Sequence, residues 1–544
     1  MRARRVGTAA ATAVLLALSG CGTAAVRDDP RPASAAGSWQ LGGTSGTGHF
    51  RPLPVPGGWG PTDAEIARAR VYVGRLSLRE RAGQVIVASY SGTGAPTALV
   101  NRLHLGGVIP FSANVAGAAQ IARSNHALQR GVHRPWPVLV GVDQEGGLVT
   151  RVTAGATAFP AFMSAGAAGD AGLTRSVYAA SGAELSAMGF NLDFAPDTDV
   201  TSGPADPAIG ARSAGSSPAR VADHVTAAVK GFASAGVVPV LKHFPGHGSV
   251  TTDSHVGLPV QRQSVRQLEK RDLVPFRSGI AAGASAVMVG HLDVRALDPH
   301  VPSSLSHAAV TGLLRGRLGF RGVAFTDSLE MGAITQRYGT ARAAVRALKA
   351  GEDVLLMPPD PRAARDGIVS AVRDGRLDHT RLDQAATRMV ALMLHHRSAP
   401  TRPRPPGSSA ALSRRLSAAA LTSVSGPCSG RLVGRRVKVT GPATAVARFR
   451  AAAAAAGLPV VRTKKAKATS VRLVGYRGRP VRGDVVVALD TPYVLGPSAA
   501  ARARLATFGD TPEAMAALVS VLLGRTTAPG HLPVPVAGVP RTGC

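Results

Sequence analysis

Aromatic side chains are scarce in this sequence: Phe, Trp and Tyr make up 4% of its 544 residues. The cores must therefore be filled mainly by Ala, Val and Leu, and the apolar fraction of 45% is ample for that purpose. The scarcity also leaves few rings on which nucleic-acid bases can stack. A chain of this length is expected to form two or more domains.

Acidic residues are few as well. The 32 Asp and Glu are outnumbered by 63 Lys and Arg, which gives a net charge of +31. A basic surface suits an anionic cell wall or membrane face, and it also suits nucleic acid. Because the chain has no recognised nucleic-acid-binding motif, we expect no nucleic-acid partner.

Two common functional motifs are missing. No Gly-x-x-x-x-Gly-Lys-Ser/Thr phosphate loop occurs in the sequence, and no Gly-x-Ser-x-Gly nucleophile elbow occurs either. Nothing in the sequence therefore indicates a nucleotide cofactor, and we expect an active site that works without any cofactor.

The N-terminus has the parts of an export signal. Residues 1–5 are basic, residues 8–18 form an apolar stretch too short for a lasting membrane anchor, and Leu18-Ser-Gly-Cys21 follows. This pattern resembles a bacterial lipoprotein signal, so we expect removal of residues 1–20, lipidation of Cys21 and anchoring on the outer face of the cell membrane. An ordinary secretory signal with an incidental Cys is the alternative, and it also implies export. The Gly-, Pro- and Ser-rich residues 21–60 are expected to be a flexible tether.

Strand-like apolar runs alternate with helical patterns between residues 61 and 397. Continuous apolar runs are typical of parallel strands that are buried on both faces. Eight such units predict a TIM-type (β/α)8 barrel, with an open doubly wound sheet as the alternative. The predicted strands are residues 85–89, 107–111, 138–142, 190–194, 237–241, 286–290, 323–326 and 354–357.

Polar side chains gather just after several of these predicted strands. Because barrel active sites lie at the carboxyl ends of strands, we expect these side chains to converge. They are Asp143 and Glu145, Asp193 and Asp197, Lys242 and His243, His291 and Asp293, and Asp327.

Residues 241–257 hold the densest group of candidate catalytic side chains: three His, one Lys and one Asp. Asp253 lies two residues before His255 in a Gly- and Thr-rich segment. In a bent loop that carboxylate can reach the imidazole, fix its tautomer and raise its basicity, as an acid–base catalyst needs. A solvated loop with scattered polar residues is the alternative.

A zinc site is a further alternative for the same segment, since His243, His247, Asp253 and His255 are all possible ligands. Pro245 and its neighbouring glycines break any helical display of these side chains. We therefore expect no metal.

Four motifs resemble glycoside hydrolase family 3, and more narrowly its β-N-acetylhexosaminidase branch. They occur in the order that the family has and cover most of residues 62–397. They are Val142-Asp-Gln-Glu-Gly-Gly-Leu-Val-Thr-Arg151, Ile209-Gly-Ala-Arg-Ser213, Lys242-His-Phe-Pro-Gly-His-Gly248 with Asp253-Ser-His255, and Gly319-Phe-Arg-Gly-Val-Ala-Phe-Thr-Asp-Ser-Leu-Glu-Met331.

The resemblance implies particular roles. In that branch an Asp-Ser-His loop supplies a His acid/base and a Thr-Asp-Ser segment supplies the nucleophile, which implies that His255 and Asp327 are catalytic and that Asp253 partners His255. Leu148 and Ala214 depart from the family pattern, which bears on substrate fit more than on chemistry. The implied sugar-binding residues are Asp143, Arg151, Arg212, Lys242 and His243.

These residue types also suit glycoside hydrolysis on chemical grounds. Cleavage needs an acid for the leaving oxygen and a carboxylate for the oxocarbenium-like centre. Asp327 can attack the anomeric carbon, while His255 can protonate the leaving group and then take a proton from water. Arg151 and Arg212 have a structural alternative as ion-pair partners of Glu145 or Asp143.

A smaller α/β sandwich domain is expected at residues 411–544, after a Pro-rich linker at residues 398–410. From residue 398 onward the chain has 22 basic and 4 acidic side chains, which suggests contact with an anionic surface. The domain loosely resembles the second domain of family 3. A helix is expected beside Pro512, capped by Asp510 or Thr511. The predicted strands are residues 437–440, 460–462, 471–474 and 484–489.

Two further features of this domain bear on its role. Glucosidase relatives draw their acid from a Glu of the second domain, whereas Glu513 is its only Glu here and sits in a helical first turn. This favours His255 as the acid. Export also permits a disulfide between Cys428 and Cys544.

We therefore expect an exported, lipid-anchored, retaining exo-β-N-acetylglucosaminidase that acts on cell-wall fragments of the peptidoglycan type. The cell-wall substrate follows from the resemblance and the expected location. A β-glucosidase or an N-acetylglucosaminide phosphorylase of the same family is one alternative. A non-catalytic glycan-binding lipoprotein is another, but it would be expected to lack Asp327, Asp253 or His255, and all three are present.

Overall fold

The computed structural model describes residues 57–461, 467–539 and 543–544. The expected signal peptide, Cys21 and most of the expected tether lie outside these residues. Among the described residues, no helix combines the length and the apolar character that a membrane crossing requires.

Eight parallel strands form one sheet in the order β11-β9-β7-β6-β3-β2-β1-β12. The two ends of this order meet, because the Thr326 N–H donates to Val354 O (2.9 Å) and Phe325 pairs with Val354. This closure confirms the barrel over the open doubly wound sheet. The strands are β1 (Ile86–Ala88), β2 (Gly107–Val108), β3 (Leu139–Val142), β6 (Leu192–Asp193), β7 (Val238–Phe244), β9 (Ala286–Val289), β11 (Val323–Thr326) and β12 (Leu355–Leu356).

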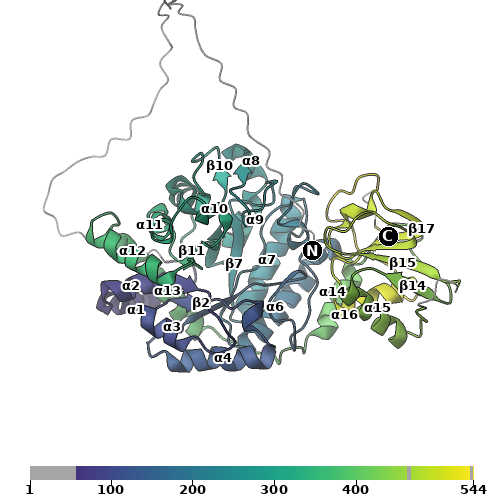
Figure 1. Cartoon of the computed structure of the whole chain (residues 1–544), viewed down its shortest axis with the longest axis horizontal. Coiled ribbons are helices and arrows are strands. Elements are labelled where there is room, and N and C mark those ends of the chain that lie inside the picture. The colour runs from purple at the N-terminus through teal and green to yellow at the C-terminus, as the bar shows by residue number, and fades with distance from the viewer. Residues whose placement is uncertain (1–56, 462–466, 540–542) are drawn as a thin grey trace, which may run out of the picture. The chain divides into compact units, whose positions relative to one another are not determined.

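All eight predicted apolar runs overlap these strands, and the strand residues are buried. Helices cover the outside of the strands (Figure 1). The helices are α1 (Asp63–Arg75), α2 (Leu78–Gln84), α3 (Thr97–Leu103), α4 (Ala118–Gly131), α5 (Met163–Ala168), α6 (Ala171–Ala187), α7 (Pro218–Ser234), α8 (Val265–Lys270), α9 (Leu273–Ala281), a π-helix (Ala308–Arg317), α10 (Gly332–Thr335), α11 (Thr340–Ala350), α12 (Pro361–Arg373) and α13 (His379–Ser398).

Two short strand pairs lie in the loops beyond the barrel strands. β4 (Gln144–Gly146) pairs antiparallel with β5 (Val149–Thr150), and β8 (Val260–Gln261) pairs parallel with β10 (Asp293–Val294). The turn of the β4–β5 hairpin needs glycine, because Gly147 has φ 58° and a Cβ there would lie 2.7 Å from that of Ala161. The hairpin is therefore held tightly against the segment that contains Ala161.

The C-terminal region has its own five-stranded sheet, in the order β13-β17-β16-β15-β14. Neighbouring strands from β14 to β17 run parallel, whereas β13 runs antiparallel to β17. The strands are β13 (Thr422–Ser425), β14 (Val437–Thr440), β15 (Thr469–Val474), β16 (Arg482–Ala488) and β17 (Ala499–Ala506), and the helices are α14 (Ala410–Ala420), α15 (Ala443–Ala455) and α16 (Pro512–Leu522).

The predictions for this sheet are partly right. Three of the predicted strands overlap β14, β15 and β16, but Val460 makes a single bridge to Val437 where a strand was expected. The sequence patterns missed β13 and β17. Thr511 caps α16, since its side chain accepts from the N–H of Ala514. Cys428 and Cys544 form a disulfide.

Glu184, a buried residue of α6, ties the predicted linker to the barrel. Its carboxylate accepts hydrogen bonds from the side chain of Thr157 (2.6 Å) and from the backbone N–H groups of Thr157, Gly407 (both 2.9 Å) and Ser409 (3.2 Å). The Arg404 N–H also donates to Ala183 O. Much of this Pro-rich segment is therefore fixed to α6 rather than free.

Candidate active site

The carboxyl ends of the barrel strands surround a cavity of about 160 Å³. All eight predicted catalytic and sugar-binding side chains line it, together with Glu145. They come from loops that lie far apart in the sequence and meet because the parallel strands all end at one face of the barrel. The lining includes Asp143, Glu145, Arg151, Arg212, Lys242, His243, Asp253, His255 and Asp327.

Glu145 lies at the centre of an ion network in one wall. Arg212 binds it through two hydrogen bonds, Nε to Oε2 (2.9 Å) and Nη2 to Oε1 (2.8 Å). Lys242 Nζ lies 2.6 Å from Glu145 Oε1 and 2.8 Å from Asp143 Oδ1. Burial by itself would raise the pKa of Glu145, but Arg212 and Lys242 hold it well below its usual range.

The two arginines combine the roles that the sequence left open. Arg212 is an ion-pair partner of Glu145, as the structural alternative proposed, and it lines the cavity as well. Arg151 lies 3.6 Å from Asp143, and its guanidinium sits over the ring of Phe111 at 4.8 Å from the centroid. Both guanidinium groups are thus oriented before any sugar arrives.

His243 is held by Asp199, a residue that sequence reasoning missed. Asp199 Oδ2 accepts from His243 Nδ1 (2.8 Å), and Asp199 Oδ1 accepts from the His247 backbone N–H (2.6 Å). Burial, reinforced by Arg212, lowers the pKa of His243 to about 4. The imidazole is therefore neutral near pH 7, with Nε2 as acceptor towards Arg212 Nη2 at 3.2 Å. Asp199 lies two residues after Asp197, in the segment that follows β6. Its position after a barrel strand is the sequence signal that could have identified it as a site residue.

Asp253 and His255 form the expected pair. Asp253 Oδ1 accepts from His255 Nδ1 (2.7 Å) and from the His255 backbone N–H (3.0 Å). Burial tends to raise the pKa of Asp253, but these hydrogen bonds from His255 lower it below its usual value. With Nδ1 engaged and the His255 side chain 73% exposed, Nε2 is the nitrogen left for acid–base work.

The loop that carries this pair is fixed from two sides. Ser254 Oγ lies 2.9 Å from Nε2 of the buried His247. On the other side, Gly332 N–H donates to His255 O and Ala333 N–H donates to Ser254 O. His247 thus contacts the loop and also lines the cavity.

Asp327 follows β11 and lines the same cavity as the loop. Its Oδ1 accepts from the Ser328 N–H at 2.8 Å. Burial would raise the pKa of Asp327, but His243, His291 and that N–H together lower it below the usual value. The carboxylate is therefore ionised at neutral pH, as a nucleophile must be.

Four other predicted strand-end residues lie outside the lining: Asp193, Asp197, His291 and Asp293. His291 donates from Nε2 to Ser328 O (2.9 Å), and its Nδ1 lies 2.7 Å from Ser304 Oγ, so both ring nitrogens already have partners. Asp193 and Asp197 are fully buried, and burial raises the pKa of Asp193 to about 8. Neither carboxylate is placed to bind a sugar hydroxyl.

One group of side chains could in principle hold a cation. Ligand atoms of Asp197, Asp199 and His243 lie within 4.8 Å of one another, a set that differs from the zinc alternative weighed from the sequence. Asp199 already accepts hydrogen bonds from His243 and His247, and the Arg212 guanidinium lies 3.5 Å from Asp197. The positive charge that a metal would supply there is thus already provided by Arg212.

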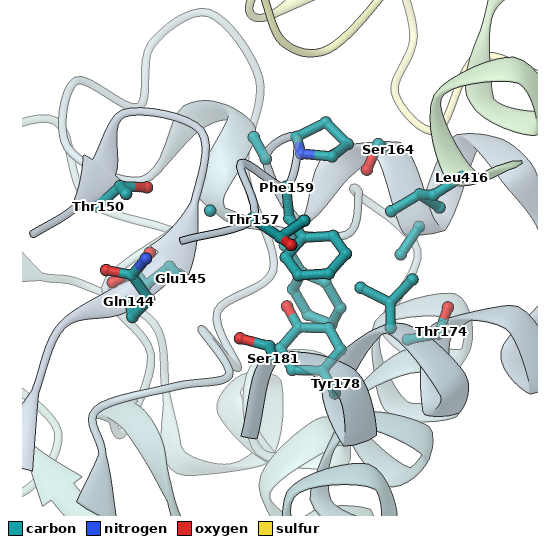
Figure 2. Close-up of a pocket in the computed structure, with 16 residues that line it drawn as sticks. Gln144, Glu145, Thr150, Thr157, Phe159, Ser164, Thr174, Tyr178, Ser181 and Leu416 are labelled. Atoms are coloured by element: carbon teal, nitrogen blue, oxygen red, sulfur yellow. The ribbon is translucent and has the colours of Figure 1, made fainter. Parts of the chain in front are cut away.

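A second, smaller space shares Glu145 with the lining of the active-site cavity. Figure 2 shows Gln144 and Glu145 on one side of it and the rings of Phe159 and Tyr178 on the other. At about 20 Å³ it has room for roughly one water molecule. A space of this volume is too small to hold a sugar.

An ionised carboxylate and a carboxylate-paired histidine share one cavity at the carboxyl face of the barrel, where they can serve as the nucleophile and the acid that cleavage of a glycosidic bond needs. The model of the glycosyl hydrolase family 3 N-terminal domain matches residues 77–392. The chain belongs to this family, which confirms the resemblance seen in its motifs.

Several relatives are similar to this chain. Beta-hexosaminidase A of Pseudoalteromonas piscicida is 35% identical over 323 residues, a match that spans 54% of each protein. Beta-hexosaminidase LpqI of Mycobacterium tuberculosis is 34% identical over 360 residues, 64% of this chain and 90% of that protein. The family 3 beta-N-acetylglucosaminidase from Paenibacillus sp. str. FPU-7 superposes with a TM-score of 0.77 at 30% identity, over 85% of this chain and 99% of that one.

Proposed function

We propose that the protein is a retaining exo-β-N-acetylglucosaminidase that removes terminal β-linked N-acetylglucosamine from cell-wall fragments. The observation that carries the proposal is the placement of Asp327 and the Asp253–His255 pair on one cavity. The names of the relatives support N-acetylglucosamine as the sugar.

The mechanism follows from the positions of these groups in the cavity. Asp327 attacks the anomeric carbon and forms a covalent glycosyl–enzyme while the glycosidic bond breaks. The proton of His255 Nε2 passes to the leaving oxygen, and Asp253 stabilises the imidazolium that exists before this transfer. The neutral imidazole then takes a proton from water, which displaces the sugar from Asp327 with net retention.

The ion network would orient the sugar. Lys242 and Arg151 can donate to sugar hydroxyls while Asp143 accepts from them, and all three side chains line the cavity. Because their partners already fix these groups, little side-chain entropy is lost when the sugar binds.

Two variants separate the catalytic roles. Asp327→Ala should lose several orders of magnitude in kcat/KM on every substrate. His255→Ala should lose much on a natural disaccharide and distinctly less on a dinitrophenyl glycoside, because a good leaving group needs little protonation. Added azide should accelerate the second step of His255→Ala, since this small anion needs no general base.

The control is His133→Ala, which changes an exposed histidine outside the cavity and should behave like wild type. Equal losses by His255→Ala on both leaving groups, with no azide response, would remove the acid/base role. Assays with aryl N-acetyl-β-glucosaminide and aryl β-glucoside, with and without phosphate, distinguish this activity from a glucosidase or a phosphorylase.

We also propose that the protein is exported and lipid-anchored through Cys21 on the outer face of the membrane. The support is the Leu18-Ser-Gly-Cys21 sequence after a basic and an apolar segment. The basic C-terminal region would then face the anionic cell wall. Wild type should partition into a detergent phase and Cys21→Ala should not; identical partitioning of the two proteins would disprove the anchor.

A further inference from the structure

A larger cavity, of about 640 Å³, opens at the carboxyl ends of the parallel strands in the C-terminal sheet. Pro442, Gly475, Asp490 and Gly509 line it, and each lies just beyond one of the strands β14 to β17. Open parallel sheets bind ligands in the crevice outside the carboxyl ends of their strands. The volume falls within the roughly 300–1,000 Å³ that is typical of small-molecule sites.

This cavity shares structural elements with the active site. In the β4–β5 hairpin, Leu148 lines the larger cavity, while the adjacent Val149 lines the active-site cavity. Arg477, next to the lining residue Tyr476, donates from Nη2 to Pro207 O (2.8 Å), and the adjacent Ala208 lines the active site. The β4–β5 hairpin therefore borders both cavities, and the Arg477–Pro207 hydrogen bond joins a neighbour of the larger cavity's lining to a segment of the active-site lining.

Apolar side chains are exposed around these two cavities. The described residues expose four large hydrophobic side chains, and three of them lie here: Leu148 (61% exposed), Tyr476 (51%) and Val256 (72%). Leu148 and Tyr476 line the larger cavity, and Val256 follows His255 in the acid/base loop. The Arg477 guanidinium sits 5.0 Å from the centre of the Tyr476 ring and steadies it. Leu148 and Tyr476 therefore give the larger cavity an exposed apolar lining, as binding surfaces have.

The charges that face the larger cavity favour an acidic ligand. Arg479 lines it and is exposed. Of the two lining carboxyl groups, Asp510 is already paired with Arg448 at 2.8 Å. The other, Asp490, is buried, and burial raises its pKa. Arg479 is thus an exposed basic group of the lining that is available to a ligand.

We propose that this cavity binds the aglycone part of an acidic oligosaccharide whose terminal sugar occupies the active-site cavity. Tyr476 and Leu148 would contact the sugar rings, and Arg479 would pair with a carboxylate on the aglycone. The inference rests on the proposed glycosidase function and extends it, because it assigns the C-terminal sheet a role in choosing longer, negatively charged substrates.

The test compares three substrates: an aryl N-acetyl-β-glucosaminide, a neutral tetrasaccharide and a tetrasaccharide with carboxylates on its inner sugars, the last two with terminal N-acetylglucosamine. Arg479→Ala should raise KM about tenfold for the acidic tetrasaccharide only, which is the low end for a lost hydrogen bond between charged groups. Tyr476→Ala should raise KM for both tetrasaccharides and leave the aryl glycoside unchanged. Both side chains are exposed, so neither change opens the core.

The matched control is Arg482→Ala, which removes the same charge from an exposed position on β16 outside the lining. It should behave like wild type on all three substrates. If wild type does not cleave the aryl N-acetyl-β-glucosaminide, the proposed function itself fails. If wild type cleaves it but Arg479→Ala and Tyr476→Ala match Arg482→Ala on the tetrasaccharides, the aglycone site alone is disproved.

Discussion

Replacing Glu145 by Gln tests the ion network most directly. The side chain of Glu145 is 3% exposed, and Gln preserves its shape while removing its charge. After this substitution, Lys242 would still have the Asp143 carboxylate as an ion-pair partner at 2.8 Å. The carboxylate partner left to Arg212 would be Asp197, at the longer distance of 3.5 Å. Removing one partner of a buried ion pair costs about 3–5 kcal/mol. Because Gln can still accept one hydrogen bond, we expect a loss near the lower end, about 3 kcal/mol.

Urea unfolding at pH 7 measures this loss. Since Arg212 and Lys242 hold the pKa of Glu145 well below its usual range, its contribution is present above the unfolded-state pKa. The contribution is lost as the pH falls through the folded-state pKa, so the gap between variant and wild type should narrow in acid. Glu330→Gln, at an exposed position, is the control and should change stability by less than about 0.5 kcal/mol. A loss for Glu145→Gln no larger than that of the control would refute the reasoning.

Three further predictions concern the active site and the buried histidines. In His247→Ala, Ser254 loses its contact and the loop that carries Asp253 and His255 loosens, so general acid catalysis should weaken. The kcat should fall about tenfold on a natural disaccharide and less on a dinitrophenyl glycoside. Ser254→Ala should give the same losses, and equal losses on both substrates would contradict this prediction. Burial lowers the pKa of His224 and His243 to about 4. The stability gained from these neutral imidazoles is therefore complete above pH 6.5 and is lost as the pH falls towards 4. The melting temperature should fall over that pH range, and it should fall less steeply in His224→Asn. Prolonged chelation should leave activity unchanged, whereas a loss restored by Zn²⁺ would show that the site needs a metal.

The sequence was sufficient to predict the barrel because buried parallel strands leave continuous apolar runs. The sequence also predicted the location of the candidate site at the carboxyl ends of the strands. Asp143, Lys242 and Asp327 each follow an apolar run, and parallel strands of a barrel all end at one face. The Asp253–His255 contact was predictable because a separation of two residues limits the geometry of the pair.

Contacts between distant segments could not be predicted in the same way. The partner of His243 is Asp199, which lies 44 residues earlier in the chain and looked like one of several acidic residues after a strand. β17 (Ala499–Ala506) contains Arg502 and Arg504, so it lacks the continuous apolar run of a buried strand. The antiparallel β13 pairs with β17, and the larger cavity is lined by the β4–β5 hairpin together with the C-terminal sheet.

The bonds of Glu184 matter for anyone who wishes to study the barrel alone. A truncation before Gly407 would remove the N–H donors of Gly407 and Ser409 and leave the carboxylate with Thr157. A buried acceptor that loses its donors costs about 1–3 kcal/mol. Excision of the C-terminal region therefore calls for a compensating change such as Glu184→Gln, and low activity of an uncompensated fragment would report a damaged barrel rather than a missing catalytic group.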